Sequence, residues 1–113
     1  MGNKNKLLVG LILLVLLAAF LSGQSTNAKI FGNVKNEDGE YLPGVEVTAT
    51  HIESNAVTTT TTGKKGSFRF LALPPGTYQV SFDLEGYQSN VVSGIRLSAE
   101  QSFTLRIKLK KKE

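Results

Sequence analysis

The side chains that could carry out chemistry in this chain are few and lie far apart in the sequence. His51 is the only histidine, and none of the 113 residues is a cysteine. A nucleophilic serine needs a basic partner, and no sequence motif pairs a serine or a carboxylate with His51. The lack of cysteine excludes disulfides, thiolate metal sites and lipid attachment through a cysteine. The sequence therefore predicts a non-enzymatic protein that needs no cofactor and no metal.

Two carboxylates, Asp38 and Glu40, come closest to a metal-binding pattern. They lie in the short acidic segment NEDGE, residues 36–40. Calcium sites use several carboxylate and carbonyl oxygens in a longer loop, whereas Asn36 and Gly39 suit the first and last positions of a tight turn. This spacing favours a plain turn over a calcium site.

Three aromatic residues are candidate surface contacts, because a sugar can stack on an exposed ring. Phe31 is out of phase with the apolar positions Ile30 and Val34, and both Tyr41 and Tyr87 lie close to turns. Each of the three also fits ordinary packing against a core or loop, and tryptophan is absent. A carbohydrate-binding module stays open as an alternative function.

The basic residues Arg106, Lys108 and Lys110 alternate on the outward side of the last expected strand. They could meet anionic lipopolysaccharide or an acidic protein, but lysines on an edge strand also prevent pairing with a second copy. The formal charge of +4 falls to +2 without Lys4 and Lys6, and the segment 106–113 alone carries +4. We expect basicity to be concentrated at the C-terminus, with 110–113 as a basic tail, and we expect no nucleic-acid partner.

The N-terminal segment reads as an export signal. Lysines precede an apolar run over residues 7–21, and small and polar residues follow it. Fifteen helical residues span about 22 Å, which is short of the roughly 30 Å of a bilayer core. We expect a signal peptide over 1–25 cleaved after Ser25 or Ala28, with a retained membrane anchor as the alternative. The exported chain would then be periplasmic, associated with the outer membrane or extracellular.

The elements that must position the candidate contacts are strands, since the apolar pattern has period two from residue 28 onward. Seven short strands separated by turns predict an all-β, antiparallel, two-sheet sandwich in one domain over 29–109. The expected inward positions are Ile30, Gly32, Val34, Val45, Val47, Ala49, Phe68, Phe70, Tyr78, Val80, Phe82, Leu84, Val91, Val92, Ile95, Leu97, Phe103, Leu105, Ile107 and Leu109. The threonine-rich segment 56–62 is expected to form a half-exposed strand.

Prolines and glycines mark the turns that delimit these strands. The most telling is Pro74-Pro75-Gly76, which interrupts a strong strand pattern by removing two backbone donors and allowing a positive φ. We expect it to form a rigid corner between two core strands. The turn residues that should define the fold are Gly39, Pro43, Gly44, Gly66, Pro74, Pro75, Gly76 and Gly86.

Three stretches together resemble a known family. The stretches GNVKNEDGEYLPGVEVTAT (32–50), GKKGSFRF (63–70) and LPPGTYQVSFDLEGY (73–87) are similar to the carboxypeptidase regulatory-like domain, a transthyretin-like (prealbumin-like) β-sandwich. The resemblance extends over about residues 29–109. Among such domains the chain looks most like the N-terminal extension of bacterial TonB-dependent outer-membrane receptors.

The resemblance implies a structural or protein-interaction module at the cell envelope, linked to TonB-dependent transport. Its expected partner is an envelope protein or a glycan. It also allows a remote alternative, because some transthyretin-like proteins hydrolyse purine catabolites. Those enzymes use several histidines and a characteristic C-terminal motif, whereas this chain has one histidine and a lysine-rich end. We therefore expect an interaction module, with a carbohydrate-binding module as the first alternative.

Overall fold

A computed structural model describes residues 26–113, so the expected signal peptide over 1–25 lies outside the described residues. Seven strands follow one another: β1 (Ala28–Asn36), β2 (Glu46–His51), β3 (Val57–Thr61), β4 (Ser67–Leu73), β5 (Gly76–Asp83), β6 (Asn90–Leu97) and β7 (Ser102–Leu109). Within this part of the chain there is no helix long and apolar enough to cross a membrane.

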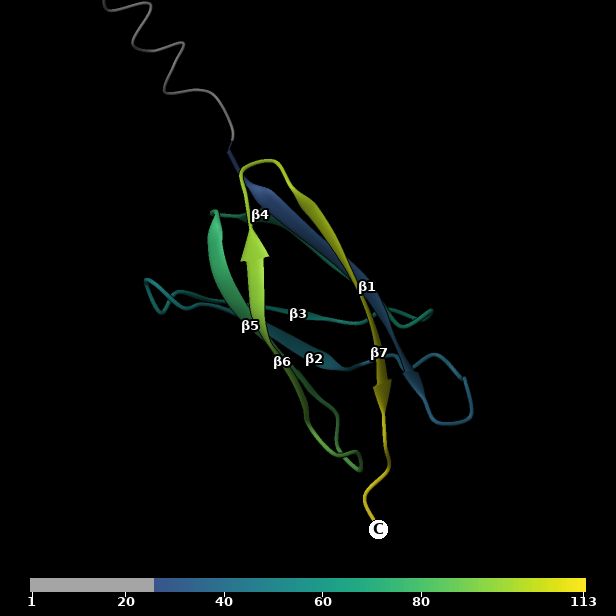
Figure 1. Cartoon of the computed structure of the whole chain (residues 1–113). Coiled ribbons are helices and arrows are strands. Elements are labelled where there is room, and N and C mark those ends of the chain that lie inside the picture. The colour runs from purple at the N-terminus through teal and green to yellow at the C-terminus, as the bar shows by residue number, and fades with distance from the viewer. Residues whose placement is uncertain (1–25) are drawn as a thin grey trace, which may run out of the picture.

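The strands form two layers, as the alternating sequence pattern predicted. One sheet has the order β4-β1-β7 and the other β3-β2-β5-β6 (Figure 1). All pairings are antiparallel except that of β1 with β7, which run parallel with Ile30 opposite Phe103 and Val34 opposite Ile107. The expected antiparallel sandwich is confirmed with this one exception, which places the first strand of the chain between β4 and the last strand.

The core lies between the two sheets and contains eighteen buried apolar side chains among the described residues. Most expected inward positions are buried, but five differ, one of them Gly32, which is partly buried. Val91 is 52% exposed, and Leu84, Val92 and Phe103 are partly buried and pack against the edge of the core. Val91 and Val92 are adjacent, and successive strand side chains point to opposite faces, so only one of them could face the core.

The corner at Pro74-Pro75-Gly76 carries the chain from one sheet to the other, since β4 and β5 belong to different layers. The Tyr78 hydroxyl donates a hydrogen bond of 2.5 Å to the Pro74 carbonyl, which closes the corner from the buried side. Gly76 has a φ of +151°, and a Cβ there would overlap with the His51 ring. The other expected turn glycines also have positive φ, namely Gly39, Gly44, Gly66 and Gly86.

The chain after β7 is attached to the opposite sheet. The Gln88 N–H donates to the Lys110 carbonyl at 2.7 Å, and the Lys112 N–H donates to the Gly86 carbonyl at 3.0 Å. Tyr87 and Lys111 form an isolated antiparallel bridge. The segment expected to be a basic tail therefore pairs, through residues 110–112, with the turn between β5 and β6.

Candidate interaction surface

The outward side of the three-stranded sheet gathers most of the cations of the domain's strands. Inward and outward residues alternate along each strand, and directly paired residues share a face. We call this side the basic face, and ten residues define it: Lys29, Phe31, Asn33 and Lys35 of β1, Ser67 and Arg69 of β4, and Ser102, Thr104, Arg106 and Lys108 of β7.

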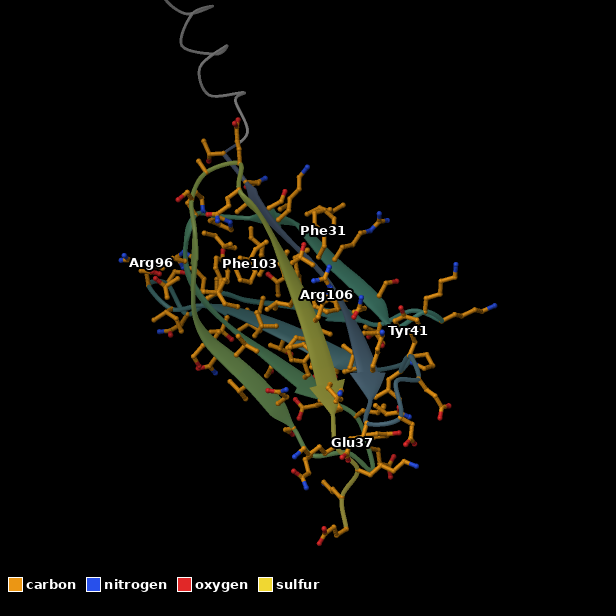
Figure 2. All side chains as sticks on the ribbon, turned by 45° about the vertical axis from the view of Figure 1, so that its right-hand side comes forward. Phe31, Glu37, Tyr41, Arg96, Phe103 and Arg106 are labelled. Atoms are coloured by element: carbon orange, nitrogen blue, oxygen red, sulfur yellow. The ribbon has the colours of Figure 1, made fainter. Side chains whose placement is uncertain are left out.

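The central strand β1 organises this face. Its apolar residues Ile30 and Val34 are fully buried, which turns Phe31 to the outside. Phe31 lies opposite Arg69 on one side and Thr104 on the other, so the ring stands in the middle row of the sheet. Figure 2 shows Phe31 and Arg106 on the same side of the molecule. Two residues that were chosen separately from the sequence thus belong to one surface.

The electrostatics of the basic face are one-sided. Five of its ten residues are cationic and none is acidic. Among residues 26–113, none of these five side chains forms an ion pair. Lys35 instead places its ammonium 4.8 Å from the centroid of the Tyr41 ring, a cation–π contact. The face therefore presents unneutralised positive charge to solvent.

A shallow groove of about 510 Å³ runs along one border of the basic face. It lies where the edge of β4 approaches β3, and its lining includes Phe31, Arg69, Ser67, Thr60 and Thr61. An aromatic ring, a guanidinium group and three hydroxyl groups therefore border one hollow. Such a mixture of ring, cation and hydroxyl groups suits a polar ligand better than an apolar one.

The remaining candidate contacts lie elsewhere. Tyr41 is 47% exposed and follows β1 at the end marked by Lys35, with which it forms a bridge. Tyr87 is partly buried and packs against the core at the turn between β5 and β6. Lys110 is exposed beyond the end of β7. The structure thus brings Phe31, Arg106 and Lys108 together, with Tyr41 beside them, and separates Tyr87.

The expectation that basicity is a C-terminal feature was wrong for the folded surface. Lys29, Lys35 and Arg69 come from two earlier strands, and the pairing of β1 with β4 and β7 places them beside Arg106 and Lys108. In a net charge summed along the chain, these three cations are offset by the carboxylates of the acidic loops. The only sequence signal was the phase of each basic residue, which is opposite to that of its buried neighbours.

The outward side of the four-stranded sheet has a different composition. We call it the hydroxyl face, and its residues are Val57, Thr59 and Thr61 of β3, Glu46, Thr48 and Thr50 of β2, Thr77, Gln79, Ser81 and Asp83 of β5, and Val91, Ser93 and Arg96 of β6. It carries two carboxylates and one guanidinium group. Figure 2 shows Arg96 on the side of the molecule away from Arg106.

A second polar constellation, which the sequence analysis missed, surrounds His51. The ring Nε2 is 3.1 Å from the Pro75 carbonyl oxygen, and Nδ1 is 2.8 Å from the Ser54 hydroxyl. Because a carbonyl oxygen only accepts, Nε2 carries the hydrogen, and Nδ1 accepts from Ser54. The His-x-x-Ser spacing was the available signal, but the carbonyl that orients the ring comes from 24 residues further along the chain.

This constellation serves the corner. The Glu53 carboxylate accepts hydrogen bonds from the Thr77 N–H at 2.7 and 3.1 Å, which holds the pKa of Glu53 below its usual 4.5. Burial, reinforced by the Glu53 charge, raises the pKa of the Tyr78 hydroxyl. The His51 ring packs edge-on against Tyr78, with centroids 5.1 Å apart. Every polar group here holds the turn after β2 against the start of β5.

The acidic loop is likewise occupied by its own turn. The buried Asn36 side chain accepts hydrogen bonds from the Asp38 N–H at 3.0 Å and the Glu40 N–H at 2.9 Å. Within residues 26–113, no three His, Asp or Glu side chains gather closely enough to hold a metal ion.

Comparison with known proteins adds a family match. The family model described as carboxypeptidase regulatory-like domain matches residues 29–110. A curated relative, Colossin-A of Dictyostelium discoideum, is 46% identical over 46 residues, which is 41% of this chain. To the nearest per cent, the matched segment covers 0% of the length of Colossin-A, so the relative is a far longer protein.

Solved structures share the fold at low sequence identity. The Bacillus anthracis TIE protein superposes with a TM-score of 0.65 at 22% identity, over 76% of this chain and 17% of that protein. The 3-chlorocatechol 1,2-dioxygenase of Rhodococcus opacus gives 0.62 at 12% identity, over 79% and 62%. The pilus 2b backbone protein of group B streptococcus gives 0.56 at 18% identity, over 75% and 41%. The chain thus spans less than two thirds of each of these proteins.

Proposed function

The chain belongs to the carboxypeptidase regulatory-like domain family, and from this premise we propose that it acts as a non-catalytic binding module at the cell envelope. The observation that carries the proposal is the basic face, where five cations surround one aromatic ring and, within residues 26–113, none of the five forms an ion pair. Strong charge of one sign on a rigid surface attracts a partner of the opposite sign and orients it. The mechanism is therefore surface complementarity and involves no bond breaking.

A binding role also agrees with how the reactive side chains are used. His51 and Ser54 are the only histidine and its nearest hydroxyl, and both are hydrogen-bonded within the corner. The fold itself does not decide the matter, because it occurs in a dioxygenase as well as in a pilus backbone protein. The local contacts of His51 are what favour a structural role over hydrolysis.

The envelope part of the proposal rests on the N-terminal segment. Its two lysines followed by an apolar run have the composition of an export signal, which supports a location in the periplasm, at the outer membrane or outside the cell. Cleavage after Ser25 or Ala28 releases the domain, whereas a retained segment would anchor it. A place beside a TonB-dependent transport system is the more specific form of this proposal.

Because the chain has no cysteine, single-cysteine variants give a clean test. Thr104→Cys lies on the basic face and Thr59→Cys on the hydroxyl face, and both positions are exposed threonines on strands. Each variant, labelled with a cysteine-reactive photocrosslinker, is expressed in a host with an intact envelope. We expect crosslinked envelope material from position 104 and little from position 59. Equal crosslinking from both positions, or none from either, would contradict the proposal.

A further inference from the structure

We propose that the basic face binds an anionic polysaccharide, a linear chain of sugar units that carry carboxylates. This inference deepens the proposed function and rests on it, since it names the class of partner for the same surface. Its support comes from three features of the face: the position of the ring, the spacing of the cations and the groups between them.

The ring of Phe31 gives the surface a flat apolar platform at its centre. It lies in the middle strand with Arg69 on one side and Thr104 on the other, and it lines the groove of about 510 Å³. Phe31 is only partly buried, so part of its side chain remains accessible to a ligand. A sugar ring has an apolar side of its own that can pack on such a platform, while its hydroxyls point outward to neighbouring polar groups.

The cations stand around this platform at intervals along the strands. Lys29 and Lys35 lie on either side of Phe31 on β1, and six residue steps of about 3.3 Å place their backbones about 20 Å apart. Arg69 flanks the ring on β4, and Arg106 and Lys108 continue the row on β7. Charges spread over this distance match a ligand that repeats its anionic group along a chain better than a single small anion.

Neutral donors and acceptors fill the spaces between the cations. Asn33 lies between Ser67 and Arg106, and Thr104 lies beside Phe31. These amide and hydroxyl groups can exchange hydrogen bonds with sugar hydroxyls while the guanidinium groups meet carboxylates, which are strong charge-assisted contacts. Arg69 is near both kinds of group, since it lies beside the Phe31 ring and borders the groove together with the hydroxyls of Thr61 and Ser67.

The same features argue against two other anionic partners. The buried centre of a protein–protein interface is mostly apolar and contains several side chains, whereas Phe31 is the one apolar side chain among the ten residues that define this face. Insertion into a membrane surface needs several protruding apolar side chains. On the strands of this sheet, Leu71 at 48% exposure is the one large apolar side chain that is exposed, and Phe31 is partly buried. An acidic polypeptide and an anionic membrane are therefore treated as competing outcomes of the test.

The test uses the full-length chain in a non-ionic detergent and three probes. Polygalacturonate carries one carboxylate on each sugar, its fully methyl-esterified form has the same backbone without charge, and polyglutamate carries carboxylates on a peptide. Calorimetry or biolayer interferometry measures binding in about 0.05 M and about 0.5 M NaCl. We expect polygalacturonate to bind at least about tenfold more tightly than either other probe, and binding to weaken strongly at the higher salt. Equal affinity for polyglutamate would assign the face to acidic proteins and overturn the proposal.

Matched variants locate the site. Arg69→Gln with Arg106→Gln removes two cations from the basic face, and Arg96→Gln removes an exposed arginine from the hydroxyl face. We expect the double variant to lose at least about tenfold in affinity for polygalacturonate and the control to keep it. Phe31→Ser should weaken polygalacturonate binding while leaving the weaker, purely electrostatic polyglutamate binding unchanged. Far-ultraviolet circular dichroism and the unfolding midpoint establish that each variant is folded.

The outcomes separate this inference from the proposed function. Vesicles of phosphatidylglycerol serve as a fourth probe, with the detergent diluted below its critical micelle concentration. Vesicle binding that is tighter than polygalacturonate binding and that is lost in the Arg69→Gln, Arg106→Gln double variant would replace the polysaccharide by a membrane surface and overturn the inference. If no probe binds but position 104 still crosslinks to envelope proteins, the inference fails and the proposed function stands. If no probe binds and position 104 crosslinks to nothing, both fail.

Discussion

The two outward faces of this sandwich differ in side-chain composition, although the same two-residue alternation along the strands forms both. The basic face carries five cations and no carboxylate, and the hydroxyl face carries threonines, serines and a glutamine with only three charges. Both faces cover the same core and both include two edge strands. The difference therefore does not come from the demands of folding, which both faces meet with any polar residue.

Stability alone would favour the composition of the hydroxyl face. Threonine suits a half-exposed strand, whereas like charges directly opposite one another destabilise a sheet. On the basic face, Lys35 lies opposite Lys108 in the parallel pair. This lysine pair therefore costs stability, which agrees with a binding role for the positive charge of the face.

The largest expected difference is in the stability lost when a glycine is replaced by alanine, compared at one position in each sheet. A Cβ on Gly32, in central strand β1, would overlap with the Leu105 carbonyl and approach the Phe68 ring to 2.5 Å. Gly94 of β6 has a φ of +73° but open space around it. We expect Gly32→Ala to lower the free energy of unfolding by about 3 kcal/mol, as overpacking does, and Gly94→Ala by about 1 kcal/mol through backbone strain.

Urea denaturation of the full chain measures both values. A Gly32→Ala variant as stable as Gly94→Ala would mean that β1 can shift relative to β7. The row of Arg69, Phe31 and Thr104 would then lack the rigid backing that the binding proposal assumes.

The second prediction separates the two roles of the threonine run. Thr62 is 5% exposed, and its hydroxyl accepts from the Val45 N–H at 2.9 Å and donates to the Leu42 carbonyl at 2.7 Å. Thr62→Val leaves both backbone groups unpaired in the interior, so we expect it to cost about 2 kcal/mol. Thr59→Val on the exposed hydroxyl face should change the unfolding free energy by less than about 0.5 kcal/mol. A cost at Thr59 equal to that at Thr62 would show that the hydroxyl face contributes to stability after all.

The sequence predicted most of the fold but not the order of all its strands. Alternation predicted the strands, the layers and nearly all of the core, because burial follows the two-residue period directly. The Pro74-Pro75-Gly76 corner was predicted because proline and glycine constrain the backbone locally. The parallel pairing of β1 with β7 was not predicted, since no local pattern states which strand of the chain will cover a given sheet edge.

The candidate surface was predictable only residue by residue. Phe31, Arg106 and Lys108 were identified from their phase, but their neighbours Lys29 and Arg69 were not. Lys29 and Arg106 are 77 positions apart along the chain, and only the strand order brings them to one face. His51 was set aside for the same reason, because its partners Pro75 and Gly76 approach through the packing of the corner.

The third prediction concerns the lysine pair that distinguishes the basic face. Lys108→Glu turns a like-charge neighbour of Lys35 into an opposite one, and we expect the free energy of unfolding to rise by about 0.5 kcal/mol at low salt. Lys108→Gln, which only removes the repulsion, should give a smaller gain. Both gains should shrink at about 0.5 M NaCl because exposed charges are screened. A loss of stability in Lys108→Glu would show that the pair is not repulsive and would remove the argument from like charges.

The smallest expected effect is a response to low pH, which should appear at the corner and not on the basic face. The Thr77 N–H lowers the pKa of Glu53 below its usual 4.5, so this contact contributes stability above about pH 4.5 and loses it as the pH falls through the lower folded value. Because Glu53 is fully exposed, the thermodynamic change is small, and nuclear magnetic resonance is the suitable measurement. The Thr77 amide shift should titrate with a midpoint below 4.5, and Glu53→Gln should abolish the transition. The Thr104 amide should stay unchanged over this range, because no carboxylate lies on the basic face. A shared transition at both amides would mean that the two sheets respond as one unit to the loss of a single contact at the corner.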